Sequence, residues 1–151
     1  MTLEEIENTL PNGLRDSDIQ SIVMDYIQRT LTIKLWVWVG ELSDTQGMRE
    51  AYKEALLMVS GLQFLTVEPP CPDYPFAESK PLRIDACDMN KNLDPSLLAS
   101  LPKDSFSRSL FVHEWNSFIH MAGLKAEITW IGTAIYRKER RHFLPGEIIA
   151  L

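Results

Sequence analysis

The chain has neither an excess of basic residues nor a long apolar run, and each absence excludes a class of protein. Its 15 lysines and arginines are outnumbered by 21 aspartates and glutamates, which gives a formal net charge of -6. A general nucleic-acid-binding protein is disfavoured, because such proteins neutralise phosphates with a basic surface. No apolar stretch approaches the roughly 20 residues of a membrane span, and the acidic start lacks a signal-peptide pattern. We expect a cytoplasmic protein whose partner is neither nucleic acid nor membrane.

Cysteine is also scarce. Cys71 and Cys87 are the only two, and they lack the CxxC spacing of a metal or redox motif. In a cytoplasmic chain both are expected to be reduced thiols. The glycine patterns of a P-loop or a Rossmann fingerprint and the GxSxG motif of hydrolases are missing as well. These absences weigh against an enzyme, and we expect no cofactor.

Composition places the chain among ordinary globular proteins. Hydrophobic residues make up 45% of its 151 positions and charged residues 24%, as in an average folded domain. This length suits one domain with a substantial core. We therefore expect a single β-rich domain over residues 1–151, in which residues 1–12 form an N-terminal helix and turn and residues 133–151 form a C-terminal extension.

The strongest pattern in the sequence is the alternation of side chains with a period of two over residues 31–39. It indicates a strand, because successive side chains of a strand point to opposite faces. An apolar run beginning at Ile19 precedes it and completes a predicted antiparallel hairpin. Further strands are expected over residues 56–67, with a break at Gly61, and over residues 82–89 and 126–131. The side chains expected to face the core are Leu31, Ile33, Leu35, Val37 and Val39.

Helices are expected to be few and short. Thr2 and Glu5 form a capping-box pattern, and residues 44–55 have a helical tendency. Asp94, followed by Pro95, has the pattern of a helix N-cap. The predicted fold class is α+β, mainly antiparallel β, in one domain with two or three short helices.

The segment HEWNSFIH, residues 113–120, raises the question of a metal site. On a helix, His113 and His120 would share a face, whereas on a strand their odd separation puts them on opposite faces. The zinc motif HExxH requires a different spacing, and a third ligand beside Glu114 is missing. Helix and strand both remain open for residues 110–122. We expect no metal here and interpret both histidines as ordinary half-buried side chains.

A protein-binding function is favoured by two groups of aromatic residues. Trp36 and Trp38 share one face of the predicted hairpin and form an aromatic stripe if that face is open. A covering helix or second sheet is the favoured alternative, because large aromatic side chains usually belong to cores. The proline-rich segment 68–81, with Tyr74 and Phe76, is either a second binding surface or a plain surface connection. The expected partner is another protein, a basic one because acidity steers such partners, or a second copy of this chain.

A small enzyme of unknown reaction is the alternative function. Its site would be built from Asp85, Cys87, His113 and Glu114, in which a cysteine and a histidine could act as nucleophile and base. A deep pocket that holds these four side chains together would favour the enzyme. A broad exposed patch without such convergence would favour protein binding.

Three stretches of the chain resemble a group of small, uncharacterised bacterial proteins. They are NGLRDSDIQSIVMDY, the following LTIKLWVWV, and FVHEWNSFIHMAGLKAEITW, which together cover roughly a third of the sequence. The group includes the β-rich, immunity-protein-like families associated with polymorphic toxin systems. The resemblance implies a toxin-neutralising role without enzymatic activity, and it favours a strand over a helix for residues 118–122. It carries no catalytic residues over to this chain.

The expected absence of a structural metal can be tested by thermal denaturation. A ligand that binds only the folded state raises the melting temperature by mass action. Removal of a metal held by His113, Glu114 and His120 would therefore lower it. We expect a chelator, followed by excess zinc, to leave the melting temperature nearly unchanged. A drop of many degrees on chelation that His113→Ala abolishes would contradict this prediction.

Overall fold

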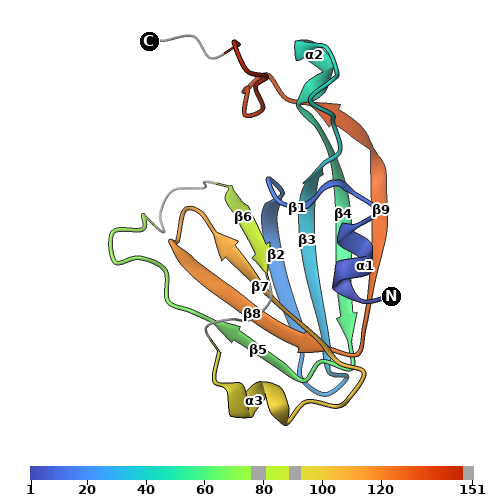
Figure 1. Ribbon diagram of the computed structural model, residues 1–151, viewed down its shortest axis with the longest axis vertical. Helices are drawn as coiled ribbons and strands as arrows, with labels where there is room; N and C mark the ends of the chain where they lie inside the picture. The colour runs from blue at the N-terminus through green and yellow to red at the C-terminus, as the bar shows by residue number, and fades with distance from the viewer. Residues whose placement is uncertain (76–80, 89–92, 148–151) are drawn as a thin grey trace.

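The computed structural model describes residues 1–75, 81–88 and 93–147. In this part of the chain, eight strands form one antiparallel sheet in the order β5-β8-β7-β6-β2-β3-β4-β9, accompanied by three short helices (Figure 1). The helices are α1 (Leu3–Glu7), α2 (Gln46–Arg49) and α3 (Pro95–Ala99). The strands are β1 (Pro11–Leu14), β2 (Asp18–Asp25), β3 (Thr30–Trp38), β4 (Ala51–Ser60), β5 (Phe64–Val67), β6 (Leu82–Asp88), β7 (Phe106–Val112), β8 (Ser117–Gly123) and β9 (Lys125–Tyr136). The predicted mainly antiparallel β fold is confirmed, although sheet predominates strongly over helix.

The predicted hairpin is formed by β2 and β3, which pair antiparallel with Ile22 opposite Ile33. The alternation along β3 has the predicted phase, since four of the five side chains expected in the core are fully buried. Val39 lies beyond the end of β3 and is only half-buried, although it still packs against the core. The fully buried side chains are Leu31, Ile33, Leu35 and Val37.

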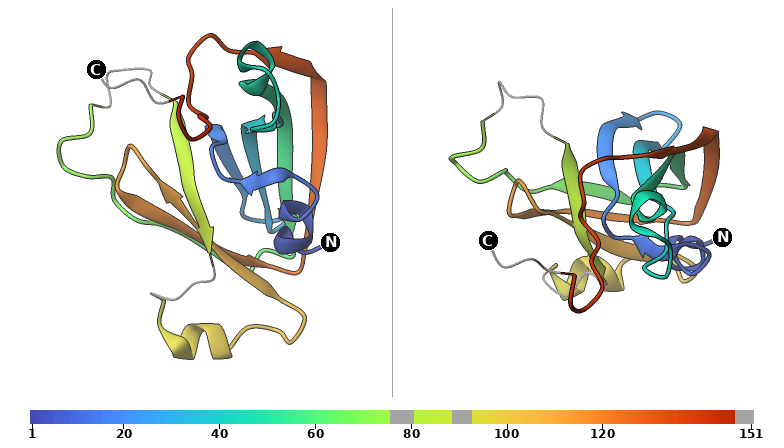
Figure 2. Two further views of the ribbon diagram at one scale, coloured as in Figure 1. Left: turned by 45° about the horizontal axis from the view of Figure 1, so that its top comes forward. Right: turned by 90° about the horizontal axis from the view of Figure 1, so that it is seen from above.

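Both halves of the sheet contribute to one hydrophobic core. The strands β2 and β6 pair over only two positions, and the sheet bends at this junction (Figure 2). Ile33 and Leu57 from one half join Leu110 and Ile119 from the other in the same cluster. At the far end the halves approach so closely that a Cβ on Gly123 of β8 would lie 2.4 Å from Val59 Cγ1 of β4. Only glycine fits this position without displacing a core side chain.

Two of the three short helices, α1 and α3, begin where the sequence predicted. The capping box is present at α1, where Glu5 N–H donates to Thr2 Oγ1 and Thr2 N–H donates to Glu5 Oε2. Asp94 caps α3 through the N–H of Ser96, and Pro95 is the first helical residue. No helix among the described residues has the length and apolar character needed to cross a membrane.

Two predicted boundaries are corrected. The helical tendency of residues 44–55 is realised only in α2, and β4 begins already at Ala51. The reason is pairing with β3, because Tyr52 lies opposite Trp38 and Ala55 opposite Leu35, and tertiary pairing overrides weak local propensity. At the C-terminus β9 continues to Tyr136, so the expected extension from residue 133 begins inside a strand.

The edge strand β9 is protected at both ends. Ala126 N–H donates to the carbonyl of Met1 at 2.6 Å, which covers one end. Near the other end a bulge lies between Ile131 and Ile135, where Gly132 has a φ of +70°. Covered ends and bulges limit the pairing of an edge with a second chain.

Which side chains of β3 face the core can be tested with two substitutions at adjacent positions. Leu35→Ala should lower the free energy of unfolding by roughly 2–5 kcal/mol, because it leaves a cavity in a packed core. Lys34→Ala should lower it by about 1 kcal/mol or less, because it leaves no cavity in the core and its ion pair with Glu54 is partly open to water. Urea denaturation measures both values. Equal effects would mean that the register of the strand is wrong.

Candidate functional site

The segment after β9, residues 137–147, folds back across one end of the sheet beside α2 (Figure 1). We call this segment the strap. Its first two attachments are arginines that share one carboxylate: Arg137 pairs with Asp18, and Arg141 Nη1 lies 3.0 Å from Asp18 Oδ1. Asp18 is only 2% exposed. Two guanidinium groups therefore compensate its buried negative charge.

His142 makes the third attachment and bridges two carboxylates. Its Nδ1 lies 2.8 Å from Glu50 Oε1, and its Nε2 lies 2.9 Å from Asp16 Oδ2. Both ring nitrogens must donate for both contacts to be hydrogen bonds, so His142 is held as an imidazolium. Burial alone would lower the pKa of His142, but its hydrogen bonds to Asp16 and Glu50 and their charges raise it above the ordinary value.

Glu50 accepts four hydrogen bonds at the centre of the network. Its Oε2 accepts the backbone N–H groups of Arg141 and His142 at 2.9 and 2.8 Å, and its Oε1 accepts Tyr52 Oη–H besides the imidazolium. Burial would raise the pKa of Glu50, but these hydrogen bonds outweigh it and lower the pKa. Glu50 follows α2 directly, so the helix end and the strap are fixed to each other.

Asp16 is positioned by an unusual backbone conformation between β1 and β2. Its φ is +67°, in the left-handed region that aspartate tolerates better than most residues. Asn12 Nδ2 donates to Asp16 Oδ2, the same oxygen that faces His142. The hydrogen bond with His142 is the main cause that lowers the pKa of Asp16.

Arg49 and Glu147 close the far end of the strap. The Arg49 side chain is 4% exposed, and its Nη1 lies 2.9 Å from Glu147 Oε1. Its Nη1 also donates to the carbonyl of His142, and its Nη2 donates to the carbonyl of Asp44. Arg49 therefore joins three segments: α2, the strap and the loop that precedes α2.

Aromatic rings complete the environment of the strap cations. Trp38 stacks on His142 with ring centroids 3.7 Å apart, and its Nε1 donates to the carbonyl of Arg49. Arg137 Cζ lies 4.0 Å from the centroid of the Tyr52 ring. Each of these two cations is thus held jointly by a carboxylate and an aromatic ring, which is a favourable electrostatic arrangement.

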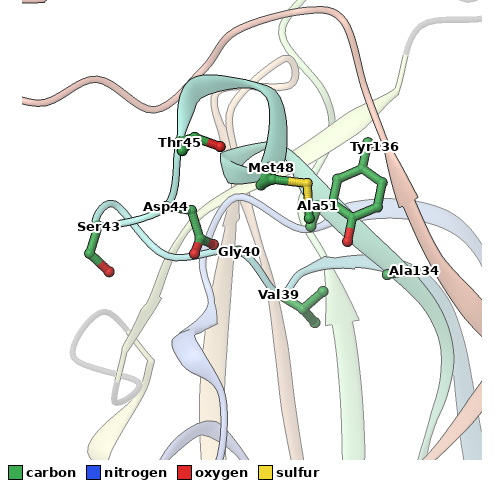
Figure 3. Close-up of a pocket in the computed structure, with 9 residues that line it drawn as sticks. All are labelled: Val39, Gly40, Ser43, Asp44, Thr45, Met48, Ala51, Ala134 and Tyr136. Atoms are coloured by element: carbon green, nitrogen blue, oxygen red, sulfur yellow. The ribbon is translucent and has the colours of Figure 1, made fainter.

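Two cavities adjoin this network and meet at Gly40. The larger, of about 510 Å³, lies between the loop before α2 and the end of β9 (Figure 3). The smaller, of about 330 Å³, includes Trp38 and His142 in its lining. The larger cavity is lined by Val39, Gly40, Ser43, Asp44, Thr45, Met48, Ala51, Ala134 and Tyr136. The smaller is lined by Pro11, Asn12, Trp38, Gly40, Glu41, Leu42 and His142.

The two predicted binding tryptophans have different surroundings. Trp38 is 5% exposed and lies under the strap. It is therefore covered, as favoured for a large aromatic residue, though by the strap rather than by a helix or a second sheet. Trp36 is half-buried, and Arg137 Cζ lies 6.0 Å from its ring centroid. The two rings do not form one open stripe in this structure.

Tyr74, the predicted binding residue of the proline-rich segment, packs against the turn between β7 and β8. Its ring meets Trp115 edge-on, with centroids 6.2 Å apart, and Cys71 N–H donates to the carbonyl of Trp115. The segment up to residue 75 is thereby attached to the sheet. Phe76 lies outside the described residues.

The four residues of the alternative enzymatic site are not brought into one cavity. Asp85 and His113 approach each other, with 3.9 Å between His113 Nδ1 and Asp85 Oδ2, but both are largely exposed. A register shift between Ile84 and Ala86 turns Cys87 toward the core, where burial raises the pKa of its thiol. Glu114 instead accepts the backbone N–H of Arg83 at 2.6 Å. Neither cavity described above includes any of the four.

The expectation that both histidines of HEWNSFIH are half-buried is wrong, because His113 is exposed and His120 is buried. His113 is in the β7–β8 turn and His120 is buried within β8, so residues 117–123 form a strand. His120 Nδ1 lies 2.6 Å from Ser109 Oγ, and its Nε2 lies 3.1 Å from Glu68 Oε2. A serine, a histidine and a carboxylate also form the catalytic triad of many hydrolases. Ser109, however, is only 3% exposed, which leaves its hydroxyl group inaccessible to a substrate. We therefore interpret these contacts as an attachment of Glu68 to the sheet.

Within residues 1–75, 81–88 and 93–147, no group of three or more potential ligands has the geometry of a metal site. Both cysteines are free in the structure. The oxidation state of their thiols and the absence of a metal in solution stay predictions.

The strap network was not predicted as a site. The basic run YRKERRHF in an otherwise acidic chain was its one visible signal. Its acceptors Asp16, Asp18 and Glu50 lie about 90 to 125 positions away in sequence, and no local spacing connects them to the run.

No protein-family model, curated protein or solved structure matches this chain. The resemblance to immunity-like proteins therefore stays a prediction.

The imidazolium of His142 should make stability depend on pH. Because the folded-state pKa of His142 is raised above 6.5, its contribution is fully present below that pH and is lost as the pH rises through the folded-state pKa. The variant His142→Gln should therefore be less stable than the wild type by the largest margin at about pH 6. The margin should shrink as the pH rises toward about pH 9. Urea denaturation across this range measures the difference.

His113→Gln is the matched control, because its side chain is 53% exposed. It should change the free energy of unfolding little, because an exposed side chain contributes little to stability. If the difference between wild type and His142→Gln were constant with pH, His142 would not be held as an imidazolium.

Proposed function

We propose that this chain is a non-enzymatic protein-binding domain whose surface for a basic partner is the end of the sheet that carries the strap. The observation that carries the proposal is the gathering of large exposed side chains around the two cavities. Met48 and Tyr136, which line the larger cavity, are 49% and 52% exposed, and Leu42, which lines the smaller, is 44% exposed. Methionine and tyrosine are enriched in protein interfaces.

The charge at this end supports a basic partner. Asp44 lines the larger cavity and Glu41 the smaller, whereas no lysine or arginine lines either. The arginines of the strap are paired with Asp18 and Glu147. Together with the net charge of -6, this arrangement would speed the approach of a basic protein, an advantage that salt would weaken.

The proposed surface is already ordered in the free protein, so binding would need no large movement of its loops. The loop 39–45 and the end of β9 form the cavity walls, and Arg49 ties that loop to α2 and the strap. A surface that is already ordered loses less conformational entropy on binding. Trp38 contributes to the smaller cavity, so its predicted binding role is kept as part of this proposal.

The finer form of the proposal is that the partner is a toxin, which the chain neutralises by binding it. This form rests on the immunity-like resemblance of the sequence. It requires that co-expression of the chain relieve growth arrest caused by the partner, and that the relief disappear with the same substitutions that abolish binding.

The protein encoded next to the gene for this chain is the first candidate partner to titrate by calorimetry. We expect a complex whose affinity falls with salt. Combined Met48→Ala and Tyr136→Ala should weaken it by about tenfold or more, as expected for interface anchors.

The combined variant Met58→Ala and Tyr26→Ala is the control. It removes the same side-chain types from exposed positions outside both cavities, so it should bind as wild type does. No complex with any adjacent gene product, or equal weakening by both double variants, would contradict the proposed surface.

A further inference from the structure

We propose that the larger cavity is a receptor for the side chain of one arginine or lysine of the partner, held between the Tyr136 ring and the Asp44 carboxylate. The proposal deepens the proposed function and rests on it, because it assigns the chemistry of the group that enters the cavity. It is carried by the lining of the cavity and by the way in which this protein already holds its own cations.

The chain holds two strap cations in the same manner. Arg137 has the Asp18 carboxylate and the Tyr52 ring, and His142 has the Glu50 carboxylate and the Trp38 ring. Each arrangement combines an ion pair with an attraction between the cation and the face of a ring. A cation that contacts both a carboxylate and a ring thus occurs twice at this end of the molecule, although His142 also contacts the second carboxylate of Asp16.

Asp44 and Tyr136 supply a third such carboxylate and ring. Figure 3 shows Asp44 on the side of the loop and Tyr136 on the side of β9, with Val39 and Gly40 between them. None of the residues that line the cavity carries a positive charge. Within the described part of the chain, no ion pair is formed by Asp44, whose Oδ2 accepts the N–H of Glu41.

The remaining lining fits a side chain with an apolar stem and a cationic end. Val39, Met48 and Ala51 provide apolar walls against which methylene groups can pack. Ser43 and Thr45 also line the cavity, and their hydroxyl groups are of a kind that can accept from the several N–H donors of a guanidinium. The volume of about 510 Å³ leaves room for one long side chain. A metal ion is disfavoured, because a single carboxylate offers too few ligands.

The test uses the full chain and a small probe, so that it is independent of the protein partner. N-acetyl-L-arginine N-methylamide is titrated while the Met48 methyl and Tyr136 ring resonances are followed by NMR. N-acetyl-L-citrulline N-methylamide, which has the same shape without the charge, is titrated in parallel. We expect saturable shifts with the arginine probe, with a dissociation constant on the order of millimolar, and binding of the citrulline probe that is about tenfold weaker.

Substitutions then separate the two recognition groups. Asp44→Asn, which keeps an acceptor for the Glu41 N–H, should weaken the binding of the arginine probe by about tenfold. Tyr136→Leu should weaken it by about threefold, whereas Tyr136→Phe should not. Glu127→Gln makes the same change of charge at an exposed position of β9, and it should leave binding unchanged.

Equal binding of the two probes to wild-type protein would overturn this proposal, and so would the absence of saturable shifts with the arginine probe. The comparison of the probes needs no variant, so a misfolded substitution cannot obscure it. Equal weakening by Asp44→Asn and Glu127→Gln would also overturn it, because general acidity would then explain the binding. In each case the calorimetric result with the protein partner stands separately, since it depends on Met48 and Tyr136 as surface anchors.

Discussion

The negative charge of Asp18, Glu50 and Asp16 must be compensated where the sheet ends, and the strap provides that compensation. Asp18 and Glu50 are almost completely buried, and an unpaired buried carboxylate would cost several kcal/mol. Arg137, Arg141 and His142 supply three positive charges from a single stretch of chain. The path of the strap, the covering of Trp38 and the position of α2 all depend on these pairs.

Such pairs contribute more to the choice of one structure than to net stability. Bringing an ion pair out of water costs about as much as the pair returns, whereas loss of one partner leaves an uncompensated charge. A strap shifted by one residue would place Arg140 or His142 where Arg141 lies and would leave His142 without its two acceptors. The two contacts of the His142 side chain, with Glu50 and Asp16, exclude such a shift, because neither neighbour of His142 can donate to both carboxylates in the same way. The cavities beside the strap therefore have fixed walls.

Features that depend on residues near in sequence were predictable, and features that depend on distant ones were not. The alternation along residues 31–37 and the caps at Thr2 and Asp94 are local signals, and the structure confirms them. The start of β4 at Ala51 depends on pairing with β3, which a local pattern does not contain. The bulge beside Ile84 likewise separates Asp85 from Cys87, although their spacing of two would place them on one face of a regular strand. Of the candidate site, Trp38 was identified from sequence, while Asp44 and Tyr136 had no distinguishing pattern.

The separation of strap and acceptors in the chain has a consequence for synthesis. Asp18 and Arg141 are 123 positions apart, and a protein is made from its N-terminus at about 5–20 residues per second. Asp18 of β2 and Glu50, which follows α2, therefore wait several seconds before their basic partners are synthesised. During that interval the earlier strands can pair as they are made, but Asp18 and Glu50 remain open to water and to any other basic chain nearby. The synthesis of residues 137–142 therefore decides when this end of the protein can close.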